Sequence, residues 1–255
     1  MSLIAGLRER ALEVTAKAGD FTLFSLRLLG AVPSLVARPS LVSAQIYNAG
    51  ALSLVIIMLA GLFVGMVLGL TGYDILQRYG SEEALGSVSA IALVKELGPV
   101  VTALLFAGRA GTSMTSEIGL MKATDQLSAL EMMAVDPVRR VCAPRFLGGV
   151  VSMPLLAAIF GMIGIFGAQL VGVHLMRVDS GQFWSELQAA MDPRYVREGL
   201  LKSCAFGVAC SAIAVHEGFR AVPTAEGVSR ATTRTVVNSS VAVLILDYML
   251  TAVLL

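Results

Sequence analysis

Residues 41–73 contain no charged side chain, and this run most constrains what the chain can fold into. It is longer than the roughly 20 apolar residues that a helix needs to cross the hydrocarbon core of a bilayer. The chain is 56% hydrophobic and 15% charged, whereas soluble domains carry roughly a quarter charged residues. The sequence therefore predicts an all-α integral membrane protein. Five transmembrane helices are expected, at about 49–70, 84–108, 146–176, 199–215 and 235–255.

Residues 1–40 mix charged and apolar side chains, and neither half of this segment forms a clean span. Leucine and phenylalanine surround Arg27, and the apolar pattern stops at Pro33. A helix that lies in the membrane interface, with its apolar face toward the lipid, accommodates such a pattern. We therefore expect an N-terminal interfacial (elbow) helix over 1–40, and a short amphipathic connection over 71–83 after the first span.

Lysine and arginine are unevenly distributed between the two sets of loops. Thirteen of them lie in the N-terminal segment and in the 109–145 and 216–234 loops, against four in the 71–83 and 177–198 loops. Cytoplasmic loops of membrane proteins carry the excess of positive charge. This distribution predicts a cytoplasmic N-terminus and, after five spans, a C-terminus on the outer side.

Two expected spans carry small residues four positions apart. The first contains Gly61, Gly65 and Gly69, and the third contains Gly164, Ala168 and Gly172. Such rows allow the backbone of another helix to approach closely within lipid. They predict tight packing, but they do not specify which helix packs on which row.

The sequence lacks the motifs of the common catalytic sites. It contains no phosphate-binding G-x-x-x-x-G-K-[ST] loop, no G-x-S-x-G and no H-E-x-x-H. His174 and His216 fall at opposite faces of the membrane in the expected topology, which argues against a shared metal site. The net charge of +1 offers no case for nucleic-acid binding. We therefore expect no catalytic residues, no metal and no cofactor in this chain.

Four charged residues fall inside the expected spans, where charge is costly and usually functional. Lys95 and Glu96 are adjacent, so they point about 100° apart on a helix and do not pair face to face. Either one faces a cavity and contacts lipid, or the two make ion pairs between helices. We expect Asp247 to hydrogen-bond to a neighbouring helix and Lys202 to extend to the outer interface.

The polar segment between the second and third spans has its own helical pattern. Apolar residues recur at three- and four-residue spacing over 122–137, two methionines lie beside them, and Asp136-Pro137 ends the pattern. Methionine surfaces adapt well to a partner. The pattern predicts a cytoplasmic helix that either docks a partner or lies on the membrane.

Three long motifs in these segments resemble the MlaE/YrbE permease family, the membrane subunits of MCE-type lipid ABC transporters. They are ELGPVVTALLFAGRAGT at 96–112, EIGLMKATDQLSALEMMAVDP at 117–137 and GVSRATTRTVV at 227–237. The resemblance covers nearly the whole chain and is weakest over 1–40. It implies a single permease domain over 1–255, in the inner membrane of a Gram-negative bacterium and with a periplasmic C-terminus.

The resemblance also implies partners and a division of labour. The chain would form a homodimer that moves phospholipid between the inner membrane and periplasmic carriers and so maintains outer-membrane lipid asymmetry. An ABC ATPase (MlaF-like) would bind ATP and Mg²⁺, and the permease would do no covalent chemistry. A STAS-domain protein (MlaB-like) would join through the ATPase, and a hexameric MCE protein (MlaD-like) would lie on the periplasmic side.

Two sets of site residues follow from the resemblance. The lipid pocket would lie between two protomers, near the outer ends of the first two spans and close to the fifth. Its expected lipid-binding residues are Leu68, Ile75, Leu76, Tyr79, Lys95 and Glu96. The 122–137 helix would be the coupling helix on the ATPase. Its expected ATPase-coupling residues are Lys122, Asp125, Leu127, Leu130, Glu131, Met132, Met133 and Asp136.

Two alternatives remain open at this point. The chain could be an ion- or proton-coupled secondary transporter that uses Lys95, Glu96 and Asp247, or a membrane scaffold that only anchors partners. The amphipathic segment at 122–137 favours the lipid permease. Many secondary transporters show internal repeats, and we find no convincing inverted repeat here.

Overall fold

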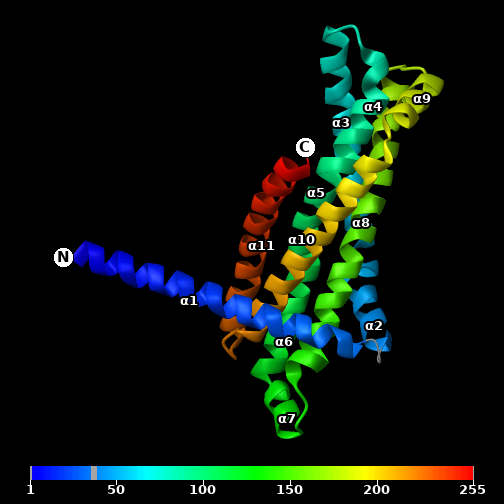
Figure 1. Ribbon diagram of the computed structural model, residues 1–255. Helices are drawn as coiled ribbons and strands as arrows, with labels where there is room; N and C mark the ends of the chain where they lie inside the picture. The colour runs from blue at the N-terminus through cyan, green and yellow to red at the C-terminus, as the bar shows by residue number, and fades with distance from the viewer. Residues whose placement is uncertain (1, 36–38, 255) are drawn as a thin grey trace.

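The computed structural model describes residues 2–35 and 39–254 (Figure 1). Within these ranges the chain forms helices and turns and no strand. Met1, residues 36–38 and Leu255, which belong to the expected elbow segment and the end of the fifth span, lie outside the described residues. The all-α fold predicted from the sequence is confirmed.

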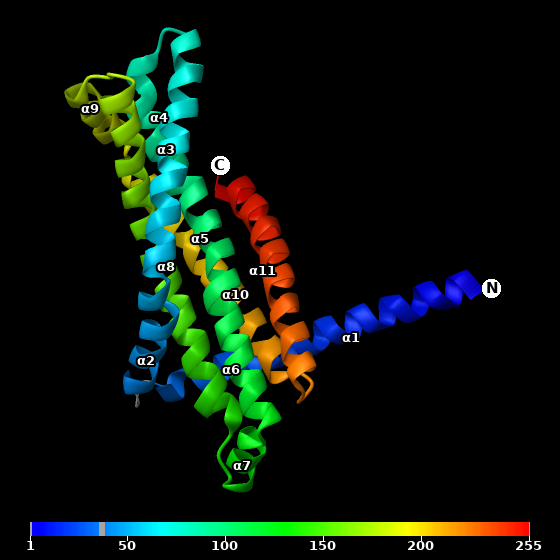
Figure 2. The same ribbon diagram turned by 180° about the vertical axis from the view of Figure 1, so that it is seen from behind.

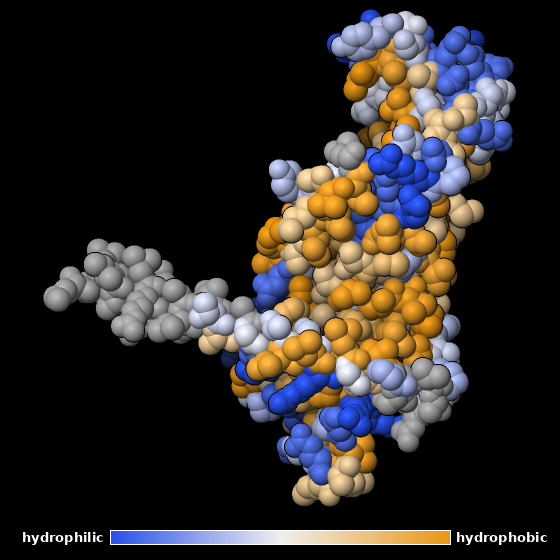
Figure 3. All heavy atoms as spheres, in the orientation of Figure 1, coloured by the Kyte–Doolittle hydropathy of each residue, from blue (hydrophilic) through white to orange (hydrophobic). Residues whose placement is uncertain are grey.

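In the described part of the chain, five helical segments are long and apolar enough to cross a membrane, as predicted. Their bounds are Pro39–Arg78, Glu82–Ala123, Val138–Leu175, Pro193–Phe219 and Ala225–Leu254. Hydrophobic residues cover the middle of the face that carries α8 and α10, and hydrophilic residues gather toward its upper and lower ends (Figure 3). This distribution is the one that a bilayer requires, because only the ends of the bundle can meet water.

The N-terminal helix α1 (Ser2–Ala31) crosses the bundle and projects away from it (Figures 1 and 2). Its C-terminal half is anchored, because Phe24 and Leu28 are buried against the third and fourth spans. Asp20 accepts hydrogen bonds from Arg220 and from Nε2 of His216, the latter at 3.2 Å. A short 3₁₀ turn, η1 (Val32–Leu35), follows. That α1 lies in the membrane interface stays a prediction.

The first span is broken near its start and ends later than predicted. It consists of α2 (Pro39–Ala49), the 3₁₀ turn η2 (Ala51–Ser53) and α3 (Leu54–Arg78). Arg109 supports the break, because its Nη1 donates to the Asn48 carbonyl at 2.6 Å and to Ser53 Oγ at 3.1 Å. The predicted connection at 71–83 is wrong in most of its length. Asp74 and Arg78 form an i,i+4 ion pair of 2.9 Å that continues the helix, and the chain turns at Gly80 (φ 63°).

The second span is one nearly continuous helix that changes winding twice. After the 3₁₀ turn η3 (Glu82–Ala84) it comprises α4 (Leu85–Ile91), η4 (Ala92–Leu97), α5 (Gly98–Phe106), η5 (Ala107–Gly111) and α6 (Thr112–Ala123). Both η4 and η5 are π-helical turns, which often mark functional sites. The sequence placed residues 109–121 in a loop, and this was wrong. The threonine hydroxyls of this stretch donate to the carbonyl four residues earlier, Thr112 to Gly108 at 2.7 Å and Thr115 to Gly111 at 3.0 Å, and so these residues fit within a helix.

The predicted helix at 122–137 is shorter than expected. Only α7 (Gln126–Met132) is regular, and it lies at one end of the bundle, beyond α6 (Figure 1). Asp125 (φ 56°) and Ala134 (φ 58°) adopt left-handed conformations, and each interrupts the helix. The segment is therefore a compact helix of about two turns between two left-handed residues.

The last three spans complete the bundle. The third comprises the π-helical turn η6 (Val138–Cys142), α8 (Ala143–Gln169) and the π-helical turn η7 (Leu170–Leu175). The short α9 (Ser180–Ala190) precedes α10 (Pro193–Phe219) and α11 (Ala225–Leu254). The fourth span starts six residues before the predicted 199, because Asp192 caps it. The Asp192 Oδ1 accepts from the Arg194 N–H at 2.7 Å, and Pro193 occupies the first turn.

The two rows of small residues pack on each other, except for Gly172, which faces Leu85 of α4. Gly61, Gly65 and Gly69 of α3 face α8, where an added Cβ on Gly65 would lie 1.9 Å from the Gly164 carbonyl oxygen. A Cβ on Gly69 would lie 2.9 Å from the Ala168 carbonyl oxygen. The backbones of α3 and α8 are therefore in direct contact along this seam, which no other residue type would allow at Gly65.

Candidate functional site

Charged side chains from three helices meet inside the bundle, at the level where α11 ends. Lys202 of α10 is fully buried, and its Nζ donates to Glu96 Oε2 at 2.5 Å and to Thr251 Oγ1 at 2.7 Å. Asp247 of α11 forms an ion pair with the same ammonium group at 3.3 Å. The expectation that Lys202 extends to the outer interface was wrong, because two carboxylates and a hydroxyl hold its ammonium group inside.

A second pair lies beside the first. Lys95 Nζ is 3.2 Å from Glu198 Oε2, and Arg194 Nε donates to Glu198 Oε1 at 2.8 Å. The Lys95 ammonium also lies 5.4 Å from the centroid of the Tyr195 ring. Because Lys95 and Glu96 are adjacent on η4, and Glu198 and Lys202 are one turn apart on α10, the two pairs form a single group.

We call these six side chains the ionic cluster; its members are Lys95, Glu96, Arg194, Glu198, Lys202 and Asp247. The cluster carries three charges of each sign and is neutral overall, which offsets much of the cost of placing charge in a low-dielectric interior. Of the two readings left open for Lys95 and Glu96, interhelical ion pairing is the one that the geometry supports. The Glu96 side chain remains 35% exposed, so one carboxylate of the cluster is still accessible.

The sequence had not connected Arg194, Glu198 and Thr251 with this cluster. Residues 177–198 were taken as an outer loop, so Glu198 was not considered a membrane residue. The Asp192-Pro193 pair is a helix-start signal that could have moved the boundary. With that start, Glu198 and Lys202 fall on one face of a helix. Glu198 can then pair with Lys95, and Lys202 with Glu96.

The expected lipid-binding residues of α3 divide into two groups. Ile75 and Tyr79 are 56% and 79% exposed and lie four residues apart on one face, with Leu68 seven residues before Ile75 on the same face. Leu68 is half-buried against the main core. Leu76 packs inward against the cluster around Leu85 and is not part of that exposed face. Their contact with lipid stays a prediction.

The expected coupling residues also divide. Leu127 is buried and Leu130 half-buried against the bundle, so these two hold α7 in place. Lys122 donates to the Phe219 carbonyl at 2.9 Å, and Asp136 Oδ1 accepts from the Val138 N–H at 2.9 Å. These four side chains therefore have structural partners within the chain.

The remaining coupling residues are free to meet a partner. Met132 is 86% exposed and Met133 is 64% exposed, and both follow the exposed carboxylate of Glu131. Asp125 is exposed in the turn that precedes α7. We call residues 131–135 the docking turn. It follows α7, which lies at one end of the bundle (Figure 1).

Comparison with known proteins agrees with this arrangement. A family model described as Permease MlaE matches residues 42–253. The chain is 54% identical, over 87% of its length and 87% of the relative, to the intermembrane phospholipid transport system permease protein MlaE of Haemophilus influenzae. Probable ABC transporter permease proteins of Rickettsia bellii and Rickettsia felis are 33% and 34% identical over 98% of this chain and 97% of theirs. The matched residues contain the ionic cluster, the docking turn and nearly all of the five spans, and the chain belongs to the MlaE permease family.

Proposed function

We propose that this chain is the membrane subunit of an ATP-driven transporter that moves phospholipid between the inner membrane and periplasmic carriers, and so maintains outer-membrane lipid asymmetry. Membership of the MlaE permease family supports this, as does the name of the Haemophilus relative. In this proposal two copies form a homodimer. A separate ABC ATPase hydrolyses ATP, a STAS-domain protein binds that ATPase, and a hexameric MCE protein receives or delivers lipid on the periplasmic side.

The single observation that carries the proposal is the docking turn. Two adjacent methionines are exposed at 86% and 64%, next to a helix whose leucines, Leu127 and Leu130, pack against the bundle. A flexible thioether surface beside a carboxylate suits a groove on a soluble partner. The neighbouring α6 runs without interruption into η5, α5 and η4, so a push on α7 would be transmitted along one helix to the ionic cluster.

Lipid would contact the exposed face of α3 and the accessible part of the ionic cluster. Ile75 and Tyr79 offer an apolar surface for acyl chains, and Leu68 continues it toward the core. Glu96 and Lys95 lie on η4, where the π-helical winding can change register when the helix is pushed. In this mechanism the chain binds and releases lipid and forms no covalent bond with it.

The docking turn can be tested by co-expression with the ATPase. Replacing Met132 and Met133 by glutamate places two charges where apolar contact is expected, and we expect the ATPase to be lost from the purified complex. The measurement is the ratio of ATPase to permease after affinity purification through a tag on the permease.

Leu175→Glu is the matched control, because Leu175 is a 66% exposed apolar residue in η7, away from the docking turn. It should leave the ratio at the parent value. Parent-level ATPase recovery with the double glutamate variant would contradict the assignment of α7 as the coupling helix.

A further inference from the structure

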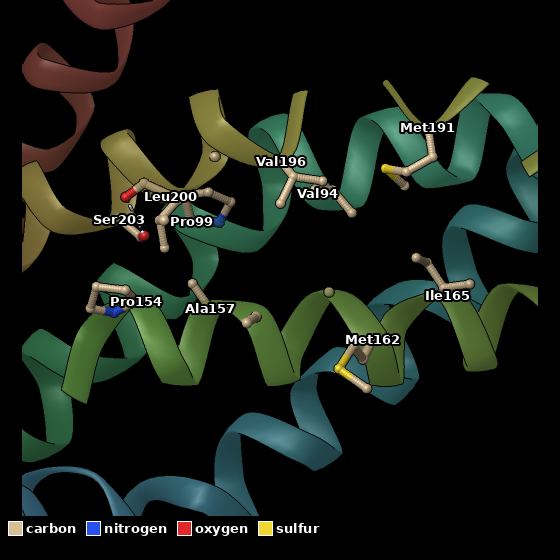
Figure 4. A pocket seen from close by; sticks show the side chains of 13 residues that line it. Val94, Pro99, Pro154, Ala157, Met162, Ile165, Met191, Val196, Leu200 and Ser203 are labelled. Carbon is tan, nitrogen blue, oxygen red and sulfur yellow. Dashed lines mark hydrogen bonds between the residues drawn. The ribbon is translucent and has the colours of Figure 1, made fainter. Parts of the chain in front are cut away.

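An apolar pocket of about 310 Å³ opens on the side of the bundle between η4–α5, α8 and α10 (Figure 4). It does not include the α3 residues expected to bind lipid or any member of the ionic cluster. The side chains that shape it include Val94, Pro99, Pro154, Met162, Leu200 and Ser203. The volume lies at the lower end of the range for small-molecule sites, roughly 300–1,000 Å³.

The pocket exists because small residues face it from two helices. Gly161 and Ala157 of α8 line its floor, and Gly199 of α10 lines its wall. At Gly199 the backbones touch, since an added Cβ would lie 2.3 Å from the Val94 carbonyl oxygen. At Gly161 an added Cβ would lie 3.8 Å from Val94 Cγ2, an ordinary contact, so the space there is open.

The pocket opens toward hydrocarbon. Met162, Leu200 and Val196 are 71%, 51% and 49% exposed, and all belong to helices that are apolar and long enough to span a membrane. The Ser203 hydroxyl donates to the Leu200 carbonyl at 2.8 Å and is therefore satisfied without a ligand. A void beside lipid would forfeit dispersion contacts on all of its walls, so an aliphatic chain is the occupant that fits.

An exposed cation follows one of the pocket residues in the sequence. Arg197 comes directly after Val196 on α10 and points about 100° away from it around the helix. Its side chain is exposed, and it has no hydrogen-bond or ion-pair partner among the described residues. Arg194, one turn earlier in sequence, is by contrast committed to Glu198. An unpaired guanidinium near the start of a spanning helix is well suited to a phosphate at the membrane surface.

We propose that this pocket binds one acyl chain of a phospholipid from the surrounding bilayer, with the phosphate of that lipid on Arg197. The site is separate from the lipid slot of the transport proposal and does not rest on it. The occupant would brace the crossing of η4 and α10, because Val94 and Gly199 meet at the pocket while their neighbours Lys95 and Glu198 form an ion pair of 3.2 Å. A lipid on the outside of the bundle would thus support the ionic cluster inside it.

The test uses phosphatidylglycerol with a photoreactive diazirine in one acyl chain, in vesicles that contain the purified full-length chain. After irradiation, mass spectrometry of peptides locates the label. We expect label on Met162 and on the 196–203 segment of α10, in excess of the label on Phe166, a 54% exposed lipid-facing residue of α8 outside the pocket.

Gly161→Leu fills the pocket, and we expect it to reduce the label on residues 196–203 by about tenfold, equivalent to about 1.4 kcal/mol of binding. Ala158→Leu, at an exposed position of the pocket wall, should also reduce the label on residues 196–203. It provides a second filled variant in case Gly161→Leu misfolds. Arg197→Gln should reduce the label about threefold, the size of one exposed charge contact. Phe166→Trp adds bulk on the same helix outside the pocket and should change nothing.

Each outcome decides the proposal. Label spread evenly over Met162 and Phe166, or unchanged in both filled variants, would mean ordinary bilayer contact and would overturn it. Loss of the label when the complete transporter is assembled would assign the pocket to a membrane helix of a partner instead. Label on the α3 face at Ile75–Tyr79 reports the transport slot and should be unaffected by Gly161→Leu. The experiment therefore tests the pocket and the transport slot separately.

Discussion

Lys202 is the residue on which the ionic cluster depends. Its ammonium group has no exposed surface and lies between carboxylates from two other helices, Glu96 and Asp247. A buried ion pair contributes little net stability compared with apolar residues, because desolvation offsets the attraction. Removal of Lys202 alone should lower stability strongly, because it leaves the buried carboxylates without a compensating charge.

We predict that Lys202→Met lowers the free energy of unfolding by about 3 kcal/mol, at the low end for a broken buried pair because Glu96 is partly exposed. The measurement is the midpoint of thermal unfolding in detergent, followed by size-exclusion chromatography. Arg78→Met is the control, because it removes a cation from the exposed pair with Asp74 and should cost less than about 1 kcal/mol. Equal losses in the two variants would show that Lys202 is not held as described.

At the scale of single residues, the sequence identified the charges but not their partners. Lys95, Glu96, Lys202 and Asp247 could be recognised because each interrupts an apolar run. Which carboxylate meets which ammonium depends on how helices from distant parts of the chain are rotated, and no local pattern records that rotation. The misplacement of Lys202 had a local cause as well, since the start of α10 was set too late and the lysine then appeared to lie near the surface.

At the scale of elements, α7 shows how a short helix is held in a defined position. It ends in a Schellman motif, with the Val135 N–H bonded to the Leu130 carbonyl at 2.9 Å and the Ala134 N–H bonded to the Glu131 carbonyl at 2.9 Å. The left-handed residue of this motif is usually glycine, yet here it is alanine with φ 58°. The motif orients the two methionines of the docking turn.

We predict that Ala134→Gly stabilises the chain by about 1 kcal/mol, because glycine has no Cβ to oppose the left-handed conformation. Ala134→Val should destabilise it, since a branched side chain is least compatible with positive φ. Thermal unfolding of the two variants beside the parent checks both signs. A loss of stability with glycine would show that Ala134 is not left-handed in solution.

The number and order of the candidate spans could be predicted from the sequence, but the helix ends and the short helix α9 could not. The spans stand out because length and hydropathy alone decide whether a segment can cross a bilayer. The ends were misplaced wherever polar residues continue a helix. Asp74 and Arg78 pair with each other at the end of α3, and the threonines of α6 bond to their own backbone. Polarity was taken to indicate loops, although these side chains are satisfied within helices.

At the scale of the whole molecule, five candidate spans predict that the two ends of the chain lie on opposite sides of the membrane. The docking turn lies at one end of the bundle, while the loop between α3 and α4, together with α9, lies at the other (Figures 1 and 2). The excess of lysine and arginine in the loops near the docking turn predicts that this end lies in the cytoplasm.

We predict that bacterial alkaline phosphatase fused after Leu254 is active, and that the same enzyme inserted after Ala134 is inactive. The enzyme needs disulfides, which form in the periplasm and not in the cytoplasm. Colony activity, corrected for the amount of fusion protein on an immunoblot, is the measurement. The opposite pattern would invert the orientation and would remove the docking turn from the compartment of the ATPase.

The glycine seam between α3 and α8 limits how such a molecule can move. Side-chain contacts can slide or exchange rotamers, but a backbone lying against a carbonyl at Gly65 and Gly164 has nothing that can give way. The two helices must therefore travel as one rigid body. By contrast, only 11% of the most apolar stretch of α11 is buried. Its inner face meets the bundle through Val243, Leu246 and Leu250 of the main core, the ionic cluster and a few hydroxyls, and no backbone seam is described there. Displacement during a working cycle would consequently concentrate at α11, with the α3–α8 pair serving as the fixed wall against which it opens.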